Sequence, residues 1–282
     1  MKRKLLGAAL MTGLVALVVV GAVAGARRAS ATGQSAPAAA PARAAAAAAK
    51  AKKGISPDAD RALHKMTDYL ASLQSFRVQS AAKDEVVLKS GQKIDLPSQS
   101  QTSVQRPNKL RSEQVGAKGG LAFTYDGKSM TLECTGNGTY ATKPAPATID
   151  GAIDQARKDF QIEAPGADLL YSQPYDILTE QVTSGLVVGH ERLDGGPVTH
   201  LAFQGEEVDW QIWIKDGAEP LPVMFSIVTK TMPSMPEFEV RLTQWETKAA
   251  LPASTFAFKA PAQGTRVETF PQTCAPNTTA ER

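Results

Sequence analysis

The chain has 282 residues, with 31 basic and 28 acidic side chains and a net charge of +3. The positive excess comes from residues 1–53, which carry nine Lys or Arg and no acidic residue, so the rest of the chain has 22 basic against 28 acidic side chains. This body is acidic overall, which argues against a nucleic-acid partner because nucleic acids require a clustered basic face, and we expect none.

Residues 1–31 are predicted to be a secretory signal peptide. A basic start at Arg3-Lys4 precedes residues 5–26, which are uncharged and apolar, and small residues suited to cleavage follow as far as Ala31. An uncleaved membrane anchor is the alternative, because an apolar stretch of this length can span a bilayer. Both interpretations place the body in the periplasm, or at least outside the cytoplasm.

One folded domain is predicted at residues 56–271. Before it, residues 32–55 are rich in Ala and Pro and offer few side chains for a core, which is typical of a disordered linker. After it, residues 272–282 are expected to be a C-terminal tail. The domain is long enough to bury one sizeable core.

Ser56-Pro57 predicts the start of an amphipathic helix, because Ser is a favoured N-cap and Pro is favoured at the first helical position. The helix is expected to run to about Ser75, with His64 on its polar side. Its apolar residues recur at helical spacing and are predicted to cover an apolar surface: Ala59, Leu63, Met66, Leu70 and Leu73.

From Phe76 the period of the apolar residues changes to two, which predicts β-strands. Asp126-Gly127 predicts a hairpin turn, since both residues accept positive φ. Pro97 lies inside the second expected strand and marks it as an edge or bulged strand. Six strands are expected, near residues 76–87, 93–105, 109–115, 120–125, 129–134 and 139–142.

A second helix is predicted from the N-cap Thr148 to Phe160, followed by short helical turns between Pro165 and Gln181. About five more strands are expected between residues 186 and 258. In one of these strands Trp210 and Trp213 are expected on opposite faces, because side chains alternate along a strand.

Helices and strands are segregated along the chain, which predicts an α+β fold with an antiparallel sheet. A sheet of about eleven strands must curl or close. If two helices cover the concave face of a curved sheet, the apolar surface beneath them either packs shut or accepts a guest molecule.

The sequence contains no Gly-x-Ser-x-Gly elbow, no phosphate-binding Gly-rich loop and no Cys–His nucleophile pattern. A metal site of His190, His200, Glu206 and Asp209 lacks any known ligand spacing, and the histidines are better interpreted as structural residues of strands. We therefore expect no catalytic residue, no metal and no cofactor.

The chain has two cysteines, Cys134 and Cys274. In an exported protein such a pair predicts one disulfide, which here would tie the C-terminal tail to a strand in the middle of the chain. Two unpaired thiols are the alternative.

Residues 198–203, 208–214 and 220–222 resemble the signature of an uncharacterised family of predicted periplasmic bacterial proteins. The resemblance covers roughly residues 57–270. Val198 departs from it, because a cysteine is expected before Thr199-His200. A thiol role shared by the family is therefore not expected here.

Three segments are more distantly similar to the outer-membrane lipoprotein carrier superfamily, which includes mycobacterial lipid-transport lipoproteins: residues 104–111, 125–128 and 251–264. The resemblance implies an unclosed, strongly curved antiparallel half-barrel, whose helices cover an apolar cavity on the concave face. It also implies a non-enzymatic carrier that shields acyl chains. In these carriers an interior arginine holds the lid, and the resemblance makes Arg106 or Arg111 the candidate.

We therefore expect a monomeric carrier or binding protein for a lipid or a lipoprotein acyl chain, with an envelope membrane protein as a further partner. The two helices would open over the sheet. The alternative is an envelope-tethered interaction scaffold whose cavity is filled by its own side chains. Aromatic content and strand position select the candidate ligand-binding residues: Leu63, Met66, Leu70, Phe123, Leu169, Tyr171, Trp210, Ile212, Phe225 and Trp245.

Overall fold

The computed structural model describes residues 54–117, 119–162, 164–271 and 274. The chain divides into two units, of which one, Met11–Lys50, lies outside these residues, and every feature below belongs to the other. The predicted signal peptide and residues 32–53 of the predicted linker also lie outside them. None of the described helices is both long and apolar enough to cross a membrane.

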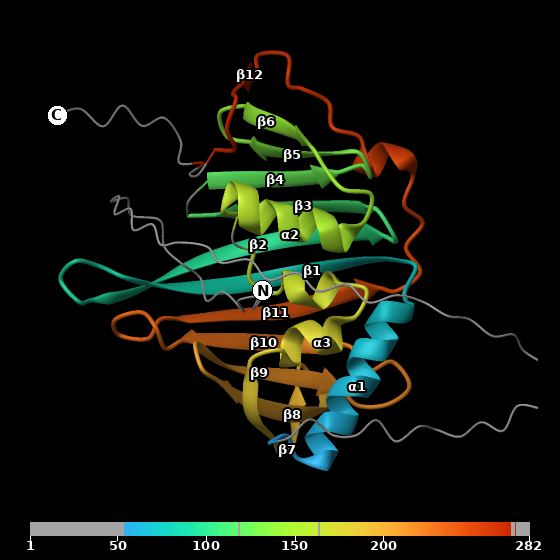
Figure 1. The fold of residues 1–282 in the computed structure, drawn as a ribbon, viewed down its shortest axis with the longest axis vertical. Coiled ribbons are helices and arrows are strands. Elements are labelled where there is room, and N and C mark those ends of the chain that lie inside the picture. The colour runs from blue at the N-terminus through green and yellow to red at the C-terminus, as the bar shows by residue number, and fades with distance from the viewer. Residues whose placement is uncertain (1–53, 118, 163, 272–273, 275–282) are drawn as a thin grey trace, which may run out of the picture. The chain divides into compact units, whose positions relative to one another are not determined.

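A twelve-stranded sheet forms the scaffold of the domain, in the order β12-β6-β5-β4-β3-β2-β1-β11-β10-β9-β8-β7 (Figure 1). Neighbouring strands are antiparallel except β12 and β6, which are parallel. The strands are β1 Ser75–Val87, β2 Lys93–Gln105, β3 Lys109–Gly116, β4 Gly119–Tyr125, β5 Ser129–Cys134, β6 Thr139–Pro144, β7 Val182–Leu193, β8 Gly196–Gly205, β9 Val208–Lys215, β10 Pro222–Thr229, β11 Glu237–Glu246 and β12 Thr265–Arg266.

The α+β class and the open, curved antiparallel sheet are confirmed. The two-residue strand β12 was not predicted, because two residues show no alternation. Strand β7 begins at Val182, before the predicted start, since Thr183-Ser184-Gly185 interrupts its apolar pattern. Pro97 pairs with Lys83 of β1 and lies one residue beyond the last β2–β3 pair, so β2 is locally an edge at this proline, as predicted.

The helices lie over one face of the sheet (Figure 1), which we call the front face: α1 Pro57–Ser72, α2 Ile149–Phe160, the 3-10 turn η1 Ala167–Leu170 and α3 Pro174–Thr179. Both predicted N-caps are present. The Ser56 hydroxyl accepts from the Ala59 N–H at 3.3 Å, and the Thr148 hydroxyl accepts from the Gly151 N–H at 3.2 Å. Each cap pairs a backbone N–H that the first turn leaves without a helical partner.

A single large hydrophobic core joins this helical layer to the front face of the sheet, with Leu63 of α1, Ile153 of α2 and Phe225 of β10 among its members. Ile55, predicted as linker, also belongs to it and is 5% exposed. The backbone around Ile55 pairs with β7, because the Ser56 N–H donates to the Gly185 carbonyl at 2.8 Å. The fold therefore begins before residue 56.

The segment after β11 crosses the opposite face of the sheet, which we call the back face. Its 3-10 turn η2, Ala253–Phe256, packs near β3, and Phe258 contacts Tyr140 of β6 with ring centroids 4.9 Å apart. The segment then pairs with β6 through β12 and reaches the front side, where Phe270 meets Phe160 of α2 edge-on at 4.6 Å. One segment thus contacts both faces.

Candidate functional site

The structure brings all ten predicted ligand-binding residues together between the helical layer and the sheet. Eight are buried in the main core, and Phe123 and Trp245 pack against it. Seven of them are at most 1% exposed: Leu63, Met66, Leu70, Tyr171, Trp210, Ile212 and Phe225. A side chain lining an empty cavity would be exposed to that space, so these seven contact protein atoms instead. The structure therefore shows no open space at these seven side chains.

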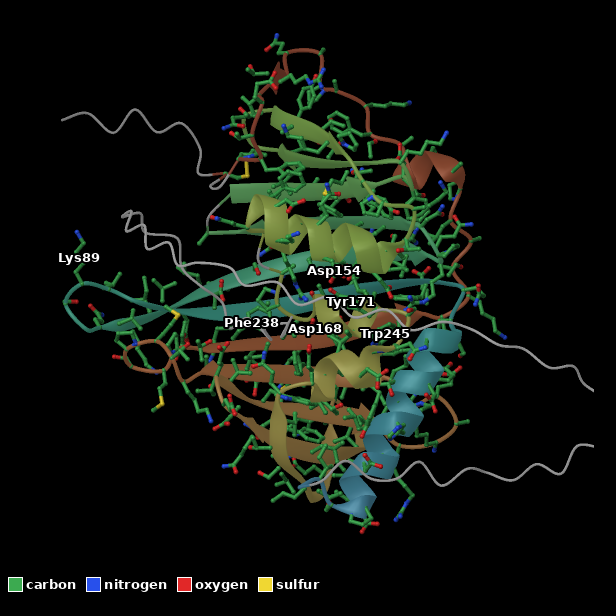
Figure 2. All side chains as sticks on the ribbon, viewed as in Figure 1. Lys89, Asp154, Asp168, Tyr171, Phe238 and Trp245 are labelled. Atoms are coloured by element: carbon green, nitrogen blue, oxygen red, sulfur yellow. A yellow bond between two sulfur atoms is a disulfide. The ribbon has the colours of Figure 1, made fainter. Side chains whose placement is uncertain are left out.

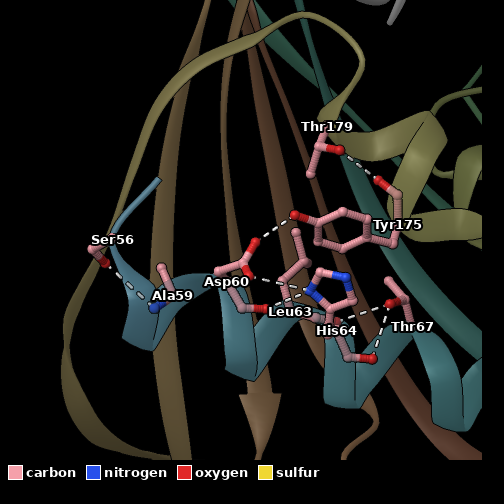
Figure 3. A network of polar contacts seen from close by, with 8 residues as sticks. All are labelled: Ser56, Ala59, Asp60, Leu63, His64, Thr67, Tyr175 and Thr179. Atoms are coloured by element: carbon pink, nitrogen blue, oxygen red, sulfur yellow. Dashed lines mark hydrogen bonds and ion pairs between the residues drawn. The ribbon is translucent and has the colours of Figure 1, made fainter. Parts of the chain in front are cut away.

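A polar contact between α1 and α3 fastens one end of the helical layer (Figure 3). The Tyr175 hydroxyl donates a hydrogen bond to Asp60, whose residue is only 4% exposed. The His64 ring stacks on Tyr175 with centroids 3.5 Å apart, and its Nδ1 lies 3.6 Å from the Asp60 carboxylate. Burial, and then the hydrogen bond to Asp60, raise the pKa of Tyr175, so the phenol keeps its proton as a donor.

The helical spacing correctly predicted that His64 lies away from the apolar side of α1. However, the side of α1 that carries His64 is covered by α3 and is not simply a solvated face. Sequence reasoning missed the contact for this reason. The one available signal was Asp60 four residues before His64, a spacing that puts both on one side of a helix.

Polar contacts also tie η1 and the residues after it to α2 (Figure 2). The Tyr171 hydroxyl donates to Asp154 at 2.8 Å, and Arg157 donates to Asp168 at the same distance. Asp168 is 3% exposed, so its charge depends on Arg157 for compensation. Burial raises the pKa of Tyr171, which therefore stays a donor to Asp154.

Arg106 fixes the layer to the sheet. It follows β2 directly, and its Nη1 donates to the carbonyl of Leu170 in η1 at 2.8 Å. Its Nε and Nη2 atoms are buried without a hydrogen-bond partner among the described residues. Burial lowers the pKa of Arg106, opposed by the nearby Asp150. This guanidinium is an incompletely paired cation under the layer.

Arg111 does not contact the layer, and its prediction as a lid residue is wrong. It alternates along β3 with the buried Leu110, so it lies on the back face, where it donates to Thr124 at 2.9 Å and pairs with Glu113. The resemblance left Arg106 and Arg111 equal, because the similar segment, residues 104–111, contains both arginines and does not fix which one corresponds to the carriers' interior arginine.

The described residues contain no cluster of three or more His, Cys, Asp or Glu that could hold a metal ion. His200, one of the metal ligands considered above, instead pairs Nδ1 with Glu191 at 2.8 Å and Nε2 with Gln211 at 2.9 Å. Its ring stacks on Trp213 at 3.9 Å, which makes it a structural residue of the sheet.

Residues 59–270 match a family described as predicted periplasmic protein (DUF2092). The chain belongs to this family. The description agrees with the predicted localisation, which is thereby confirmed. A comparison with curated proteins found no match.

This family member also resembles solved structures at low identity. They include LprF from Mycobacterium bovis, with 15% identity, 70% of this chain and 97% of that chain covered, and a TM-score of 0.44. Lipoprotein LppX from Mycobacterium tuberculosis has 14% identity, coverage of 69% and 98%, and a TM-score of 0.43. A LolA superfamily protein from Nitrosomonas europaea has 13% identity, coverage of 71% and 97%, and a TM-score of 0.34.

In this periplasmic family member Cys134 of β5 and Cys274 form a disulfide, with Cα atoms 5.0 Å apart. The predicted tail is therefore covalently attached to the sheet at Cys274, and the rest of residues 272–282 lies outside the described residues. Disulfides persist in the oxidising periplasm, so the bond is compatible with that compartment.

Proposed function

We propose that the domain is a non-enzymatic extracytoplasmic binding domain for an acyl chain of a lipid or a lipoprotein, and that the structure describes its closed state. One observation supports this above all. The broad apolar front face is covered by a helical layer that is attached mainly through side chains and the Arg106–Leu170 contact. Backbone hydrogen bonds join it to the sheet and its turns locally, from Ser56 to Gly185 and from Ile149 to Pro107. The layer can move while the strand ladders stay intact.

Burial of apolar surface would hold the guest. Each Å² of apolar surface removed from water contributes about 25 cal/mol, so an acyl chain needs no specific polar partner. Opening would break the Asp60–Tyr175 and Arg106–Leu170 contacts. The incompletely paired guanidinium of Arg106 would then be available at the base of the layer to bind a polar head group. The segments that resemble lipoprotein carriers imply the same class of ligand.

Native mass spectrometry tests the proposal most directly. The full chain is expressed with its own leader, purified from a bacterial envelope without detergent, and incubated with membrane lipids. We expect a mass excess that organic extraction removes and that resolves as a lipid. A bare polypeptide mass in both preparations contradicts the proposal.

The three tryptophans provide a second test with an internal control. Trp210 and Trp245 belong to the front side, whereas Trp213 belongs to a separate small cluster with Val198 and Met224. A brominated fatty acid quenches only indoles that it contacts. Saturable quenching is expected in the Trp213→Phe variant and is expected to be lost in the Trp210→Phe/Trp245→Phe variant. Equal quenching of both variants places the fatty acid elsewhere.

The burial of seven candidate residues to at most 1% exposure favours a second function, an interaction scaffold whose core is permanently filled. It predicts no bound lipid and no quenching in any tryptophan variant. The same two experiments therefore separate the two functions.

A further inference from the structure

The back face of the sheet carries a cavity of about 470 Å³. Strands β1, β2, β3 and β5 form its floor, and residues 254–259 of the C-terminal segment form its roof. Its charged groups are Arg77, Arg111 and Lys259, together with Glu113 and Glu133. It lies on the opposite face from the acyl-chain site proposed above and does not depend on that proposal.

The strand register explains why these side chains meet. Phe76, Val104 and Leu110 point into the core, so their neighbours Arg77, Ser103 and Arg111 point to the back face. Arg77 pairs with Ser103, and Ser103 pairs with Arg111. The two arginines thus occupy one row, two strands apart, which is roughly 10 Å between their Cα atoms. Both guanidinium groups can reach one ligand of moderate size.

The carboxylates that pair with the two arginines are exposed to water, while Arg111 also donates to Thr124 at 2.9 Å. Arg77 donates to Ser103 at 3.4 Å and to Glu246 at 3.3 Å, both of which are long hydrogen bonds. Arg111 pairs with Glu113, whose side chain is 46% exposed, while that of Glu246 is 54% exposed. Exposed ion pairs of this kind contribute little stability, and both carboxylates can rotate into water when an anion arrives.

We propose that this cavity binds an oxyanion on a hydroxyl-rich ligand, a sugar acid or a sugar phosphate. The guanidinium fork matches the geometry of carboxylates and phosphates, and Lys259 adds a third cation at the roof. Ser103, Thr255 and Gln101 offer hydrogen bonds to sugar hydroxyls. The cavity volume lies within the range of about 300–1,000 Å³ that is usual for small-molecule sites.

Glu133 of β5 is the second carboxyl group that lines the cavity, beside Glu113. Burial raises the pKa of its carboxyl group, with Arg111 opposing the rise and Glu113 adding to it.

Isothermal titration calorimetry on the full chain tests the proposal with three probes: glucuronate, glucose 6-phosphate and neutral glucose. We expect at least one of the two anions to bind with a Kd at least about tenfold lower than that of glucose, and the better anion identifies the acid or the phosphate as the natural group. Equal binding of glucose, or no binding of either anion, overturns the proposal.

Charge-removing variants locate the site. Arg77→Gln, Arg111→Gln and Lys259→Gln are each expected to weaken anion binding about tenfold, the usual effect of losing one charge-assisted contact. Arg192→Gln removes the same charge from β7, outside the cavity, and is the matched control. An equal loss in the control overturns the proposal, since it shows a response to net charge alone. Because Lys259 is exposed, Lys259→Gln is expected to fold and to test the proposal even if Arg111→Gln does not fold.

Discussion

Asp60 shows how one residue links two helices. It lies in the first turn of α1, where a carboxylate interacts favourably with the helix N-terminus, yet it is only 4% exposed. A buried carboxylate is stable only when its oxygens accept hydrogen bonds. Tyr175 of α3 provides one and His64 lies within ion-pair distance, so the position of α3 depends on a polar group that α1 carries.

The Tyr175→Phe substitution is therefore expected to lower the free energy of unfolding by about 1–3 kcal/mol, because it leaves Asp60 without its donor while the ring is retained. Urea unfolding followed by circular dichroism measures this. Tyr69→Phe is the matched control on α1, since the Tyr69 hydroxyl makes no hydrogen bond within the described residues. Equal losses in the two variants contradict the assigned role.

Some residues could be placed from sequence alone and others could not. Trp210 and Trp213 were correctly predicted on opposite faces, because the period of a strand is local. Arg106 and Arg111 could not be distinguished, since the similarity to the carriers does not fix which one corresponds, and the contact of Arg106 with Leu170 of η1 is what places it under the helices. The contact of His64 with Tyr175 joins residues 111 positions apart, which no local pattern reveals.

At the scale of elements, the disulfide holds the C-terminal segment against the sheet. Cys134 and Cys274 are 140 residues apart in sequence, so the bond strongly restricts the unfolded chain. The Cys134→Ser/Cys274→Ser variant is expected to lose about 2–4 kcal/mol of unfolding free energy. Urea titrations with and without dithiothreitol measure the effect. The reduced wild type should match the variant, and a variant as stable as the oxidised wild type contradicts the prediction.

Element prediction succeeded where patterns were long and failed where they were short. The predicted alternation identified strands β1 to β11, and cap residues identified the starts of α1 and α2. The crossing of the C-terminal segment over the back face was not predicted, because η2 and β12 are too short to show a period. The back-face cavity was missed for the same reason, since this segment forms its roof.

At the scale of the whole domain, three tyrosines are expected to make the free energy of unfolding decrease at alkaline pH. Burial is the main cause of a raised pKa at Tyr125, Tyr171 and Tyr175, and it raises the pKa of Tyr125 to about 12. Each ionises in the unfolded chain near pH 10 but keeps its proton in the folded one. Their contribution is therefore fully present below pH 10 and is lost as the pH rises above it.

We expect the free energy of unfolding to fall above pH 10 by up to about 1.4 kcal/mol per pH unit for each of these tyrosines. Urea unfolding at pH 8, 9, 10 and 11 measures the slope. Tyr175→Phe should give a shallower slope than the wild type. A free energy of unfolding that stays constant up to pH 11 contradicts this prediction.

The backbone pairing at Gly54–Ser56 also bears on self-association. β7 is an edge strand of the sheet, and its side chains Leu186 and Val188 are 53% and 51% exposed. An edge strand with exposed apolar side chains favours the addition of a strand from a second chain. The hydrogen bonds to Gly185 occupy the first part of this edge, and a register shift between Val187 and Gly189 bends the next part. An incoming strand finds no long, flat run of free backbone groups, so the start of the fold guards the domain against edge-to-edge aggregation.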